Sequence, residues 1–482
     1  MNVKRRYILA GLALSLLAAG GCIPRRVFWS PDGQRAALIA EDGLRLCDAS
    51  GKLSDVAAKD VQLVAWMPDS SRFIGESKIT AASWQEAQAA LSAERREALI
   101  RLAGPLHDEI LGYSGDWDKF KPRLPAELTD GELSALYLYV RDHRRDGLPE
   151  KLGDKWKDVE KMTADVHLLQ VYEVSDLIAA PGRILTRTLD DIWNLQIAPD
   201  GGAVACVQAV SGGERAIFRL SVMPIDGGPL RTVAEPVAIY PDWTPDGRSL
   251  VYATARSKPT DGGDAIQLGT LSRRRVRAES GRPLPEFEAP DDLVGGLFWP
   301  QNKVRCLRDG RVLFSAMEVT LPATAKDMPQ RATLFCVDPA RQPTATRVIP
   351  REAEAALPDG IQNGYFELSP DEKRVAVCGA DHGNVSVLTL ATGEVQAVVS
   401  QRDIELKSVP TWRTSGELSV FVPPKSAWGS ADRYELVLWA GPEKARCLSC
   451  GWPPIFEKKA APATSPATGP AASGTTPLRK AG

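Results

Sequence analysis

A tight turn that recurs between short apolar segments constrains the fold of this chain more than any other feature of the sequence. The first copy, Ser30-Pro31-Asp32-Gly33, follows the aromatic pair Phe28 and Trp29 and precedes the apolar segment 36–40. Proline presets φ near −65°, aspartate accepts hydrogen bonds from backbone amides two residues further on, and glycine adopts a positive φ. This combination joins two antiparallel strands, so the repeat predicts a fold built from many short β-hairpins.

The turn returns along the chain at a regular interval. Further copies carry their aspartate at Asp69, Asp200, Asp246 and Asp371, and two degraded copies without the proline carry Asp309 and Ser415 at that position. Successive copies are 37, 131, 46, 63, 62 and 44 residues apart, and leaving out residues 80–164 brings the second spacing into line with the others. A period of about 45 residues with four short strands per repeat is typical of β-propeller blades.

The residues around the turn also resemble a known family. An apolar residue stands three positions before the aspartate, most often a tryptophan, as in Trp29, Trp66 and Trp243. The aromatic residue followed by Ser-Pro-Asp-Gly resembles the propeller repeats of the TolB family over roughly residues 25–451. The resemblance implies an all-β propeller. The seven copies of the turn, five clear and two degraded, predict about seven blades, with six or eight as alternatives. The turn aspartates are interpreted as turn formers, with a ligand role as the alternative.

Residues 80–164 interrupt the second blade and follow a helical pattern. Apolar residues recur at helical spacing from Ala87 to Leu102, and a capping box, Thr129-Asp130-Gly131-Glu132, precedes a second apolar series. These features predict a small helical insertion between the second and third strands of blade two. Its mixed charge does not indicate a nucleic-acid arm. The insertion is either a cap packed on the ring or a dedicated partner-binding module.

The N-terminal residues indicate export and lipid attachment. Three basic residues precede an apolar run over 7–17, and small residues then lead to Cys22. This order predicts a signal peptide over 1–21. Small residues directly before a cysteine resemble the bacterial lipobox, which implies lipid attachment to the Cys22 sulfur. The alternatives are an ordinary secretory signal and an uncleaved membrane helix, although the apolar stretch is shorter than the roughly 20 residues that cross a bilayer.

The predicted organisation has five parts. They are a lipoprotein signal peptide (1–21), the first blade and part of the second (22–79), the helical insertion (80–164), the rest of the propeller (165–456) and a tail rich in Ala, Pro and Thr (457–482). The tail lacks hydrophobic periodicity and is expected to be disordered.

Cys447 and Cys450 form a C-x-x-C pair near the last predicted strand. In an exported protein this pair is interpreted as a disulfide, as half of a metal site, or as two unpaired strand residues. A second C-x-x-C is absent from the sequence. Seven cysteines remain after Cys22, an odd number, so complete pairing is excluded.

No motif in the sequence predicts catalysis. The four histidines do not form a metal-ligand pair of the H-E-x-x-H type; they are His107, His143, His167 and His382. The segment 112–115 does not match the G-x-S-x-G motif of the serine hydrolases that carry similar propellers. We therefore predict no catalytic residue, no metal and no cofactor, and the protein is not expected to be an enzyme.

The net charge and the predicted location of the protein together define the expected function. Lys and Arg total 59 against 61 Asp and Glu, a net charge of −2 that lacks the basic excess of a nucleic-acid-binding protein. By analogy with other envelope propellers, the expected role is a lipid-anchored interaction or scaffold protein with an envelope protein partner, facing the periplasm or the exterior. The alternative is a small-molecule, glycan or peptide binder, or an atypical enzyme, that uses the predicted central channel.

Overall fold

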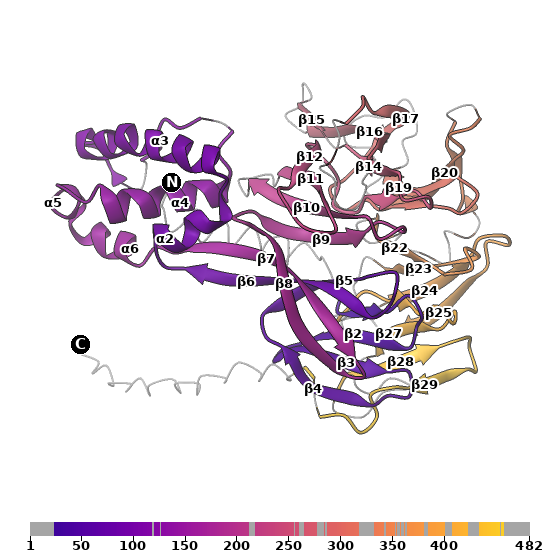
Figure 1. The fold of residues 1–482 in the computed structure, drawn as a ribbon. Helices are drawn as coiled ribbons and strands as arrows, with labels where there is room; N and C mark the ends of the chain where they lie inside the picture. Colours follow the sequence, from indigo (N-terminus) through magenta and orange to yellow (C-terminus); the bar gives the residue numbers. More distant parts are fainter. Residues whose placement is uncertain are drawn as a thin grey trace, which may run out of the picture.

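The structure is a computed structural model. It describes residues 24–456 apart from 118–119, 126, 212–216, 255, 260–264, 277–283, 285–286, 318–331, 342–343, 352, 354–356, 358–360, 362–363, 380–383, 401–406, 423–432 and 454. The predicted signal peptide 1–21, the predicted lipid-attachment residue Cys22 and the predicted tail 457–482 lie outside the described residues. The described chain consists of antiparallel β-sheets and one group of helices (Figure 1).

Five sheets have four strands each, and in each of them neighbouring strands are also consecutive in the sequence. The first contains β1 (Val27–Trp29), β2 (Arg35–Ala40), β3 (Gly43–Asp48) and β4 (Leu53–Ala58). The second contains β5 (Val61–Trp66), β6 (Arg72–Ala81), β7 (Ala164–Ser175) and β8 (Ile178–Thr188). The third contains β9 (Asp191–Ile197), β10 (Ala203–Ser211), β11 (Ile217–Pro224) and β12 (Arg231–Ala234).

The last two four-stranded sheets close the chain. One contains β22 (Phe366–Leu368), β23 (Arg374–Cys378), β24 (Asn384–Thr389) and β25 (Val395–Ser400). The other contains β26 (Thr411–Trp412), β27 (Leu418–Val422), β28 (Glu435–Trp439) and β29 (Ala445–Cys447).

Between the third and the last two sheets lies one larger sheet of nine strands. It contains β13 (Asp242–Trp243), β14 (Ser249–Ala253), β15 (Arg256–Pro259), β16 (Ala265–Arg275), β17 (Asp291–Leu297), β18 (Val304–Cys306), β19 (Val312–Met317), β20 (Ala332–Val337) and β21 (Thr346–Arg347). A single residue pair, Leu297 with Met317, joins β17 to β19.

The fold is an all-β propeller, but the predicted blade count is not what the sheets show. In the described part of the chain, five blades stand as separate four-stranded sheets, whereas seven were predicted. The difference arises in the nine-stranded sheet, where the pairing of Leu297 with Met317 merges two groups of strands that the sequence pattern treats as separate repeats.

The sheets form a closed ring through their first strands. Strands β1, β5 and β9 contact one another in order, β13 contacts β18, and β22 contacts β26. The last sheet returns to the first, because β26 contacts β1 and the Trp29 indole donates to the Ser419 hydroxyl at 3.0 Å. The first and the last sheet each keep their own four strands, so among the described residues no strand is exchanged at the closure.

The recurring turn has the predicted geometry. The Oδ1 atom of Asp32 accepts the backbone N–H of Gln34 at 3.0 Å, and Asp200 and Asp246 accept the N–H two residues further on in the same way. Glycine follows at positive φ, 68° at Gly33 and 69° at Gly247. The turn-former interpretation of these aspartates is therefore confirmed.

The helices lie together at the ends of the long strands β6 and β7, on one side of the molecule (Figure 1). They are α2 (Trp84–Ala87), η1 (Gln88–Ala90), α3 (Ala93–Gly112), α4 (Asp130–His143), α5 (Leu148–Leu152), η3 (Gly153–Lys155) and α6 (Trp156–Glu160). The helix α4 begins with a complete capping box, in which Thr129 and Glu132 bond each other's backbone N–H at 3.1 Å.

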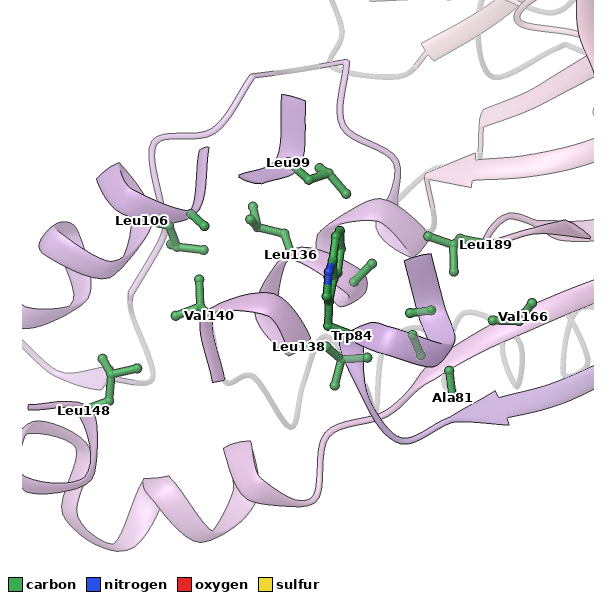
Figure 2. Close-up of a cluster of buried hydrophobic side chains, with 14 of the residues drawn as sticks. Ala81, Trp84, Leu99, Leu106, Leu136, Leu138, Val140, Leu148, Val166 and Leu189 are labelled. Atoms are coloured by element: carbon green, nitrogen blue, oxygen red, sulfur yellow. The ribbon is translucent and has the colours of Figure 1, made fainter. Parts of the chain in front are cut away.

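One hydrophobic core connects these helices to the ring. Trp84, Leu99 and Leu136 from the helices lie in the same buried cluster as Val166 of β7 and Leu189 of the β8–β9 connection (Figure 2). Burial of this shared apolar surface holds the helices to the propeller. Among the described residues, no helix has both the length and the apolar character required to cross a bilayer.

Candidate functional site

A cluster of charged and aromatic residues lies at the start of strands β1, β13, β18 and β22. We call this group the central polar cluster: Arg25, Tyr240, Asp242, Lys303, Arg305, Tyr365 and Glu367. Its members come from β13, β18, β22 and the residues that immediately precede them, and Arg25 reaches it from the chain just before β1. Segments up to 342 positions apart in sequence thus converge at one place in the ring.

The ion pair between Lys303 and Glu367 is the core of this cluster. Their side chains are each 7% exposed, and Lys303 Nζ lies 2.7 Å from Glu367 Oε1. The Tyr365 hydroxyl donates to the same carboxylate oxygen. The Lys303 ammonium also lies over the Tyr365 ring, 4.2 Å from its centroid, a cation–π contact that is strengthened by desolvation.

Burial and neighbouring charges set the protonation of this pair. Burial alone would raise the pKa of Glu367. The positive charges of Lys303, Arg25 and Arg305 outweigh burial and lower that pKa to about 2. Burial lowers the pKa of Lys303 to about 8 against the opposing attraction of Glu367. Both groups are therefore charged at neutral pH. In this desolvated site, each charge is stabilised by the other.

A second ion pair extends the cluster toward β13. Arg305 Nη1 lies 3.1 Å from Asp242 Oδ1, and the other carboxylate oxygen accepts the backbone N–H of Cys306 at 2.8 Å. Burial raises the pKa of Asp242 despite the favourable charge of Arg305. The Arg25 guanidinium, whose side chain is 42% exposed, lies 3.7 Å from Glu367. The cluster therefore holds three cations and two carboxylates, with one cation at the solvent boundary.

A buried histidine lies near the junction between the ring and the helices. His167 Nδ1 lies 2.7 Å from Glu76 Oε1, and Nε2 lies 2.9 Å from Asp191 Oδ1. Burial alone would lower the pKa of His167, but its hydrogen bonds to Asp191 and Glu76 outweigh burial and raise it to about 9. His167 is therefore a permanent cation at neutral pH that links β6, β7 and β9.

Asp190 lies beside this histidine and contacts the helices directly. Its carboxyl interacts with the side chain of Thr129, the N-cap of α4, and Arg219 Nη1 lies 3.8 Å from its Oδ2 atom. Burial raises the pKa of Asp190 to about 6 against these two stabilising partners. The first turn of α4 and the start of the third sheet are thus joined by polar contacts as well as by the hydrophobic core.

A groove of about 520 Å³ lies between the second and third sheets, at the end where the recurring turns lie. Its apolar floor includes Met67, Val171 and Ile225, and charged residues line it from both sheets. Two arginines in the lining pair with aspartates of the same groove, Arg72 with Asp69 at 2.8 Å and Arg183 with Asp226 at 3.5 Å. Glu173 and Asp200 line the groove as well, so its lining holds four carboxylates against two guanidinium groups.

Of the sequence-predicted site residues, the structure describes the two cysteines of the C-x-x-C pair. Cys447 Sγ and Cys450 Sγ are bonded to each other at 2.04 Å. The Glu435 carboxylate lies beside them, and the three ligand-type atoms fall within 4.8 Å of one another. Both sulfurs are engaged in their mutual bond, so this group does not offer free thiolates to a metal.

The histidines do not converge in the described chain. His107 Nε2 lies 2.9 Å from the carbonyl of Asp146, and His143 packs against the Tyr139 ring at 4.7 Å. His167 is held in the buried cluster described above, and His382 lies outside the described residues.

Sequence reasoning missed the central polar cluster, although a signal for it exists. Asp242, Arg305 and Glu367 each stand directly before the apolar residue that leads into the turn, in three successive copies of the repeat. The positions two residues earlier in the same copies hold Tyr240, Lys303 and Tyr365. Together these six residues make up the cluster apart from Arg25. Residues two apart on a strand face the same side, so equivalent positions in neighbouring repeats could have been expected to meet.

Comparison with known proteins yields low similarity. No family model and no curated protein matches the chain. Among solved structures, TolB from Acinetobacter baumannii is 14% identical with a TM-score of 0.35, and the match covers 56% of each chain. The β-propeller domain of Cps50 (Swd1) from Myceliophteria thermophila is 9% identical with a TM-score of 0.39, covering 83% of this chain and 94% of that one.

A puromycin-hydrolyzing peptidase from Mycobacterium tuberculosis is 15% identical with a TM-score of 0.38, covering 59% of this chain and 43% of the peptidase. The match to TolB thus spans about half the length of that protein. The assignment of the propeller fold rests on the strand pairing of this chain itself.

Proposed function

We propose that this chain is a lipid-anchored protein-interaction module of the bacterial cell envelope, with the helical insertion as its binding arm. The observation that carries the proposal is the rigid attachment of the insertion to the ring. Strands β6 and β7 stay paired up to Ala81 and Ala164, and Ser83 already caps α2. An arm without a flexible linker presents its surface in a fixed orientation, which reduces the entropy lost on binding.

The N-terminal segment supports a membrane anchor close to the ring. The Pro24 carbonyl accepts the backbone N–H of Val409 at 3.0 Å, and the N–H of Arg26 donates to Ser408 Oγ at 3.0 Å. A lipid on Cys22 would be two residues from this fixed point, about 7 Å at full extension. The ring edge where the first strands begin would then face the membrane.

The insertion emerges at the same edge of the ring. The first strand of each sheet ends at the recurring turn, so the antiparallel connection between second and third strands returns to the edge where first strands begin. Because the insertion occupies the β6–β7 connection, its helices would be presented to the membrane side, where a neighbouring envelope protein would be met.

We further infer that the ring has seven blades. The nine-stranded sheet divides at the single pair Leu297–Met317 into one group led by β13 and another led by β18. Asn194 and Gln196 of β9 bond to carbonyls next to β13 at 2.8 and 2.7 Å, and Lys303 beside β18 reaches Glu367 of β22. These contacts complete a cycle of seven first strands, and an experimental structure with seven innermost strands would establish the count.

The interaction role is tested by photo-cross-linking in cells. A photoreactive amino acid replaces Arg101 on α3 or Lys157 on α6, whose side chains are 70% and 74% exposed. Arg341, 86% exposed on the ring, serves as the matched control. We expect one discrete adduct from the two insertion positions and none from the control. Identical adduct patterns at all three positions, or no adduct, would refute the role of the insertion.

Substitution is preferable to deletion in this experiment, because removing the helices would expose Val166, Leu168 and Leu189 of the shared core.

The anchor is tested separately with Cys22→Ser. We expect incorporation of labelled palmitate into the wild-type protein and none into the variant, which should also leave the membrane fraction. Equal labelling of both proteins would reject the anchor without affecting the interaction test.

A second candidate function is the binding of a small carboxylate-bearing ligand at the central polar cluster. The cluster holds one more cation than carboxylates, and Arg25 is partly open to solvent. Calorimetric titration with citrate and with a short acidic peptide tests this candidate, with Arg25→Gln expected to weaken binding at least ten-fold. Absence of binding to the wild-type protein by both probes would dismiss it.

A further inference from the structure

The Cys447–Cys450 bond lies at the surface of the last sheet. Cys447 ends β29 and is half-buried, whereas Cys450 is exposed in the turn that follows. A thiolate from another molecule therefore has access to the Cys450 sulfur, and Cys447 becomes the leaving group. Exposed disulfides are the ones that exchange readily with external thiols.

A buried carboxylate lies close to the sulfur of Cys447, the leaving group. Glu435, 3% exposed, places Oε2 at 3.8 Å from Cys447 Sγ. The Ser449 hydroxyl donates to the same oxygen, and Arg433 Nε donates to Oε1 at 2.7 Å. These two contacts orient the carboxylate toward the sulfur, where it can accept the proton of the Cys447 thiol when that thiol attacks a disulfide.

Hydrogen bonds also hold the turn that carries the disulfide. The Leu448 N–H donates to the Leu436 carbonyl at 2.8 Å, the Leu436 N–H donates to Ser449 Oγ at 2.8 Å, and the Trp452 indole donates to the Gly51 carbonyl at 2.6 Å. The disulfide closes a loop of only four residues, for which the entropic stabilisation of the folded state is smallest. Reduction can therefore occur with the turn in place.

The other described cysteines lack this environment. Cys47, Cys206 and Cys378 are buried, and burial raises the pKa of each of these thiols to about 12. Cys306 and Cys336 are half-buried, and burial raises the pKa of these two thiols as well. Such thiols carry almost no thiolate at neutral pH and are poor nucleophiles.

We propose that Cys447 and Cys450 form a redox-active pair that exchanges with external thiols, with Glu435 as the proton acceptor for Cys447. In reduction, an external thiolate attacks Cys450 Sγ, the bond between the two protein sulfurs breaks, and Cys447 leaves as a thiolate that takes up a proton. A second external thiolate then attacks the external sulfur of the mixed disulfide and releases Cys450. Two external thiols become one disulfide, and the protein gains two electrons and two protons. This proposal does not rest on the interaction role.

The pair is tested in the folded protein by maleimide labelling in glutathione buffers. We expect both thiols to appear together as reduced glutathione increases, while circular dichroism stays unchanged, and no such step in the Cys447→Ser, Cys450→Ser double variant. Labelling that begins only when the protein unfolds would overturn the proposal.

The single variants identify the attacked sulfur, since Cys447→Ser should form a mixed disulfide with oxidised glutathione at least ten-fold faster than Cys450→Ser. Equal rates would overturn that assignment.

The role of Glu435 is tested by the rate at which oxidised glutathione re-forms the bond. We expect Glu435→Gln to slow this step about ten-fold at neutral pH and Glu435→Asp to restore part of the rate. Glu443, an exposed carboxylate in the β28–β29 turn, supplies the control Glu443→Gln, which should match the wild type. A wild-type rate in folded Glu435→Gln would remove Glu435 from the mechanism. Should that variant fail to fold, Ser449→Ala, which frees the carboxylate to rotate, is expected to slow the same step.

Discussion

The ion pair between Lys303 and Glu367 shows how strongly a buried charge depends on its partner. Both side chains are 7% exposed, so water does not replace a missing partner. Substituting Glu367→Gln leaves the Lys303 ammonium buried without a counter-charge. We expect the free energy of unfolding in urea to fall by about 3–5 kcal/mol, the range for breaking one side of a buried pair.

A double-mutant cycle separates the pair from simple packing loss. In a Lys303→Met background, Glu367→Gln no longer leaves a buried ammonium without its counter-charge, and it should cost clearly less. Equal costs in the two backgrounds would mean that the pair is not coupled, in spite of the 2.7 Å contact.

His167 makes the stability of the protein depend on pH. Its hydrogen bonds to Asp191 and Glu76 raise the pKa from 6.5 to about 9 against the effect of burial. A raised pKa means that the folded state holds the proton more tightly, so this contribution is complete below pH 6.5 and is lost as pH rises through 9. It amounts to about 3 kcal/mol.

The measurement is the difference in unfolding free energy between the wild type and His167→Gln from pH 5 to pH 10. We expect the difference to shrink steadily above pH 6.5 and to level off above pH 9. Parallel curves across the whole range would show that His167 is not a folded-state cation.

At the scale of elements, the junction between α4 and the ring depends on a close approach that only glycine allows. A Cβ on Gly131 would lie 2.1 Å from the Leu189 carbonyl oxygen, so the helix or the strand connection must move. Helix propensity alone would favour Gly131→Ala by about 1 kcal/mol. We expect instead a net loss of about 1–3 kcal/mol from overpacking.

Gly104 in α3 provides the matched control. A Cβ there meets nothing within 4 Å, so Gly104→Ala should follow propensity and stabilise the protein by about 0.5–1 kcal/mol in urea unfolding. Stabilisation by both substitutions would show that the insertion is not pressed against Leu189.

These elements also show how far local sequence patterns reach. The turns and the capping box at Thr129 follow from residues within four positions of each other, and both are present as predicted. The pairing of Leu297 with Met317 and the meeting of Lys303 with Glu367 depend on how neighbouring repeats stack, which no local pattern encodes. The repeat itself could therefore be predicted from the sequence. The separation of the blades and the central polar cluster could not.

At the scale of the whole molecule, stability depends on one seam between the first and last sheets. The Arg413 side chain donates to the Gly33 carbonyl at 2.6 Å, and the Trp452 indole donates to the Gly51 carbonyl at 2.6 Å. Trp452 is buried in the cluster that also contains Trp29 and Phe456. These contacts join positions about 400 residues apart. In the described part of the chain, no disulfide crosses this seam.

Trp452→Ala tests whether the ring opens at this seam. The loss of a large buried side chain costs about 3–5 kcal/mol. If the seam is the weakest boundary, hydrogen exchange should accelerate about 100-fold or more in β1–β4 and β26–β29 and change little in β9–β12. Trp84→Ala, which removes an equally buried indole from the helical core, should confine its effect to the insertion and the strands it packs on. Uniform acceleration in every sheet of Trp452→Ala would instead mean that the propeller unfolds as one cooperative unit, with the seam no weaker than any other contact between blades.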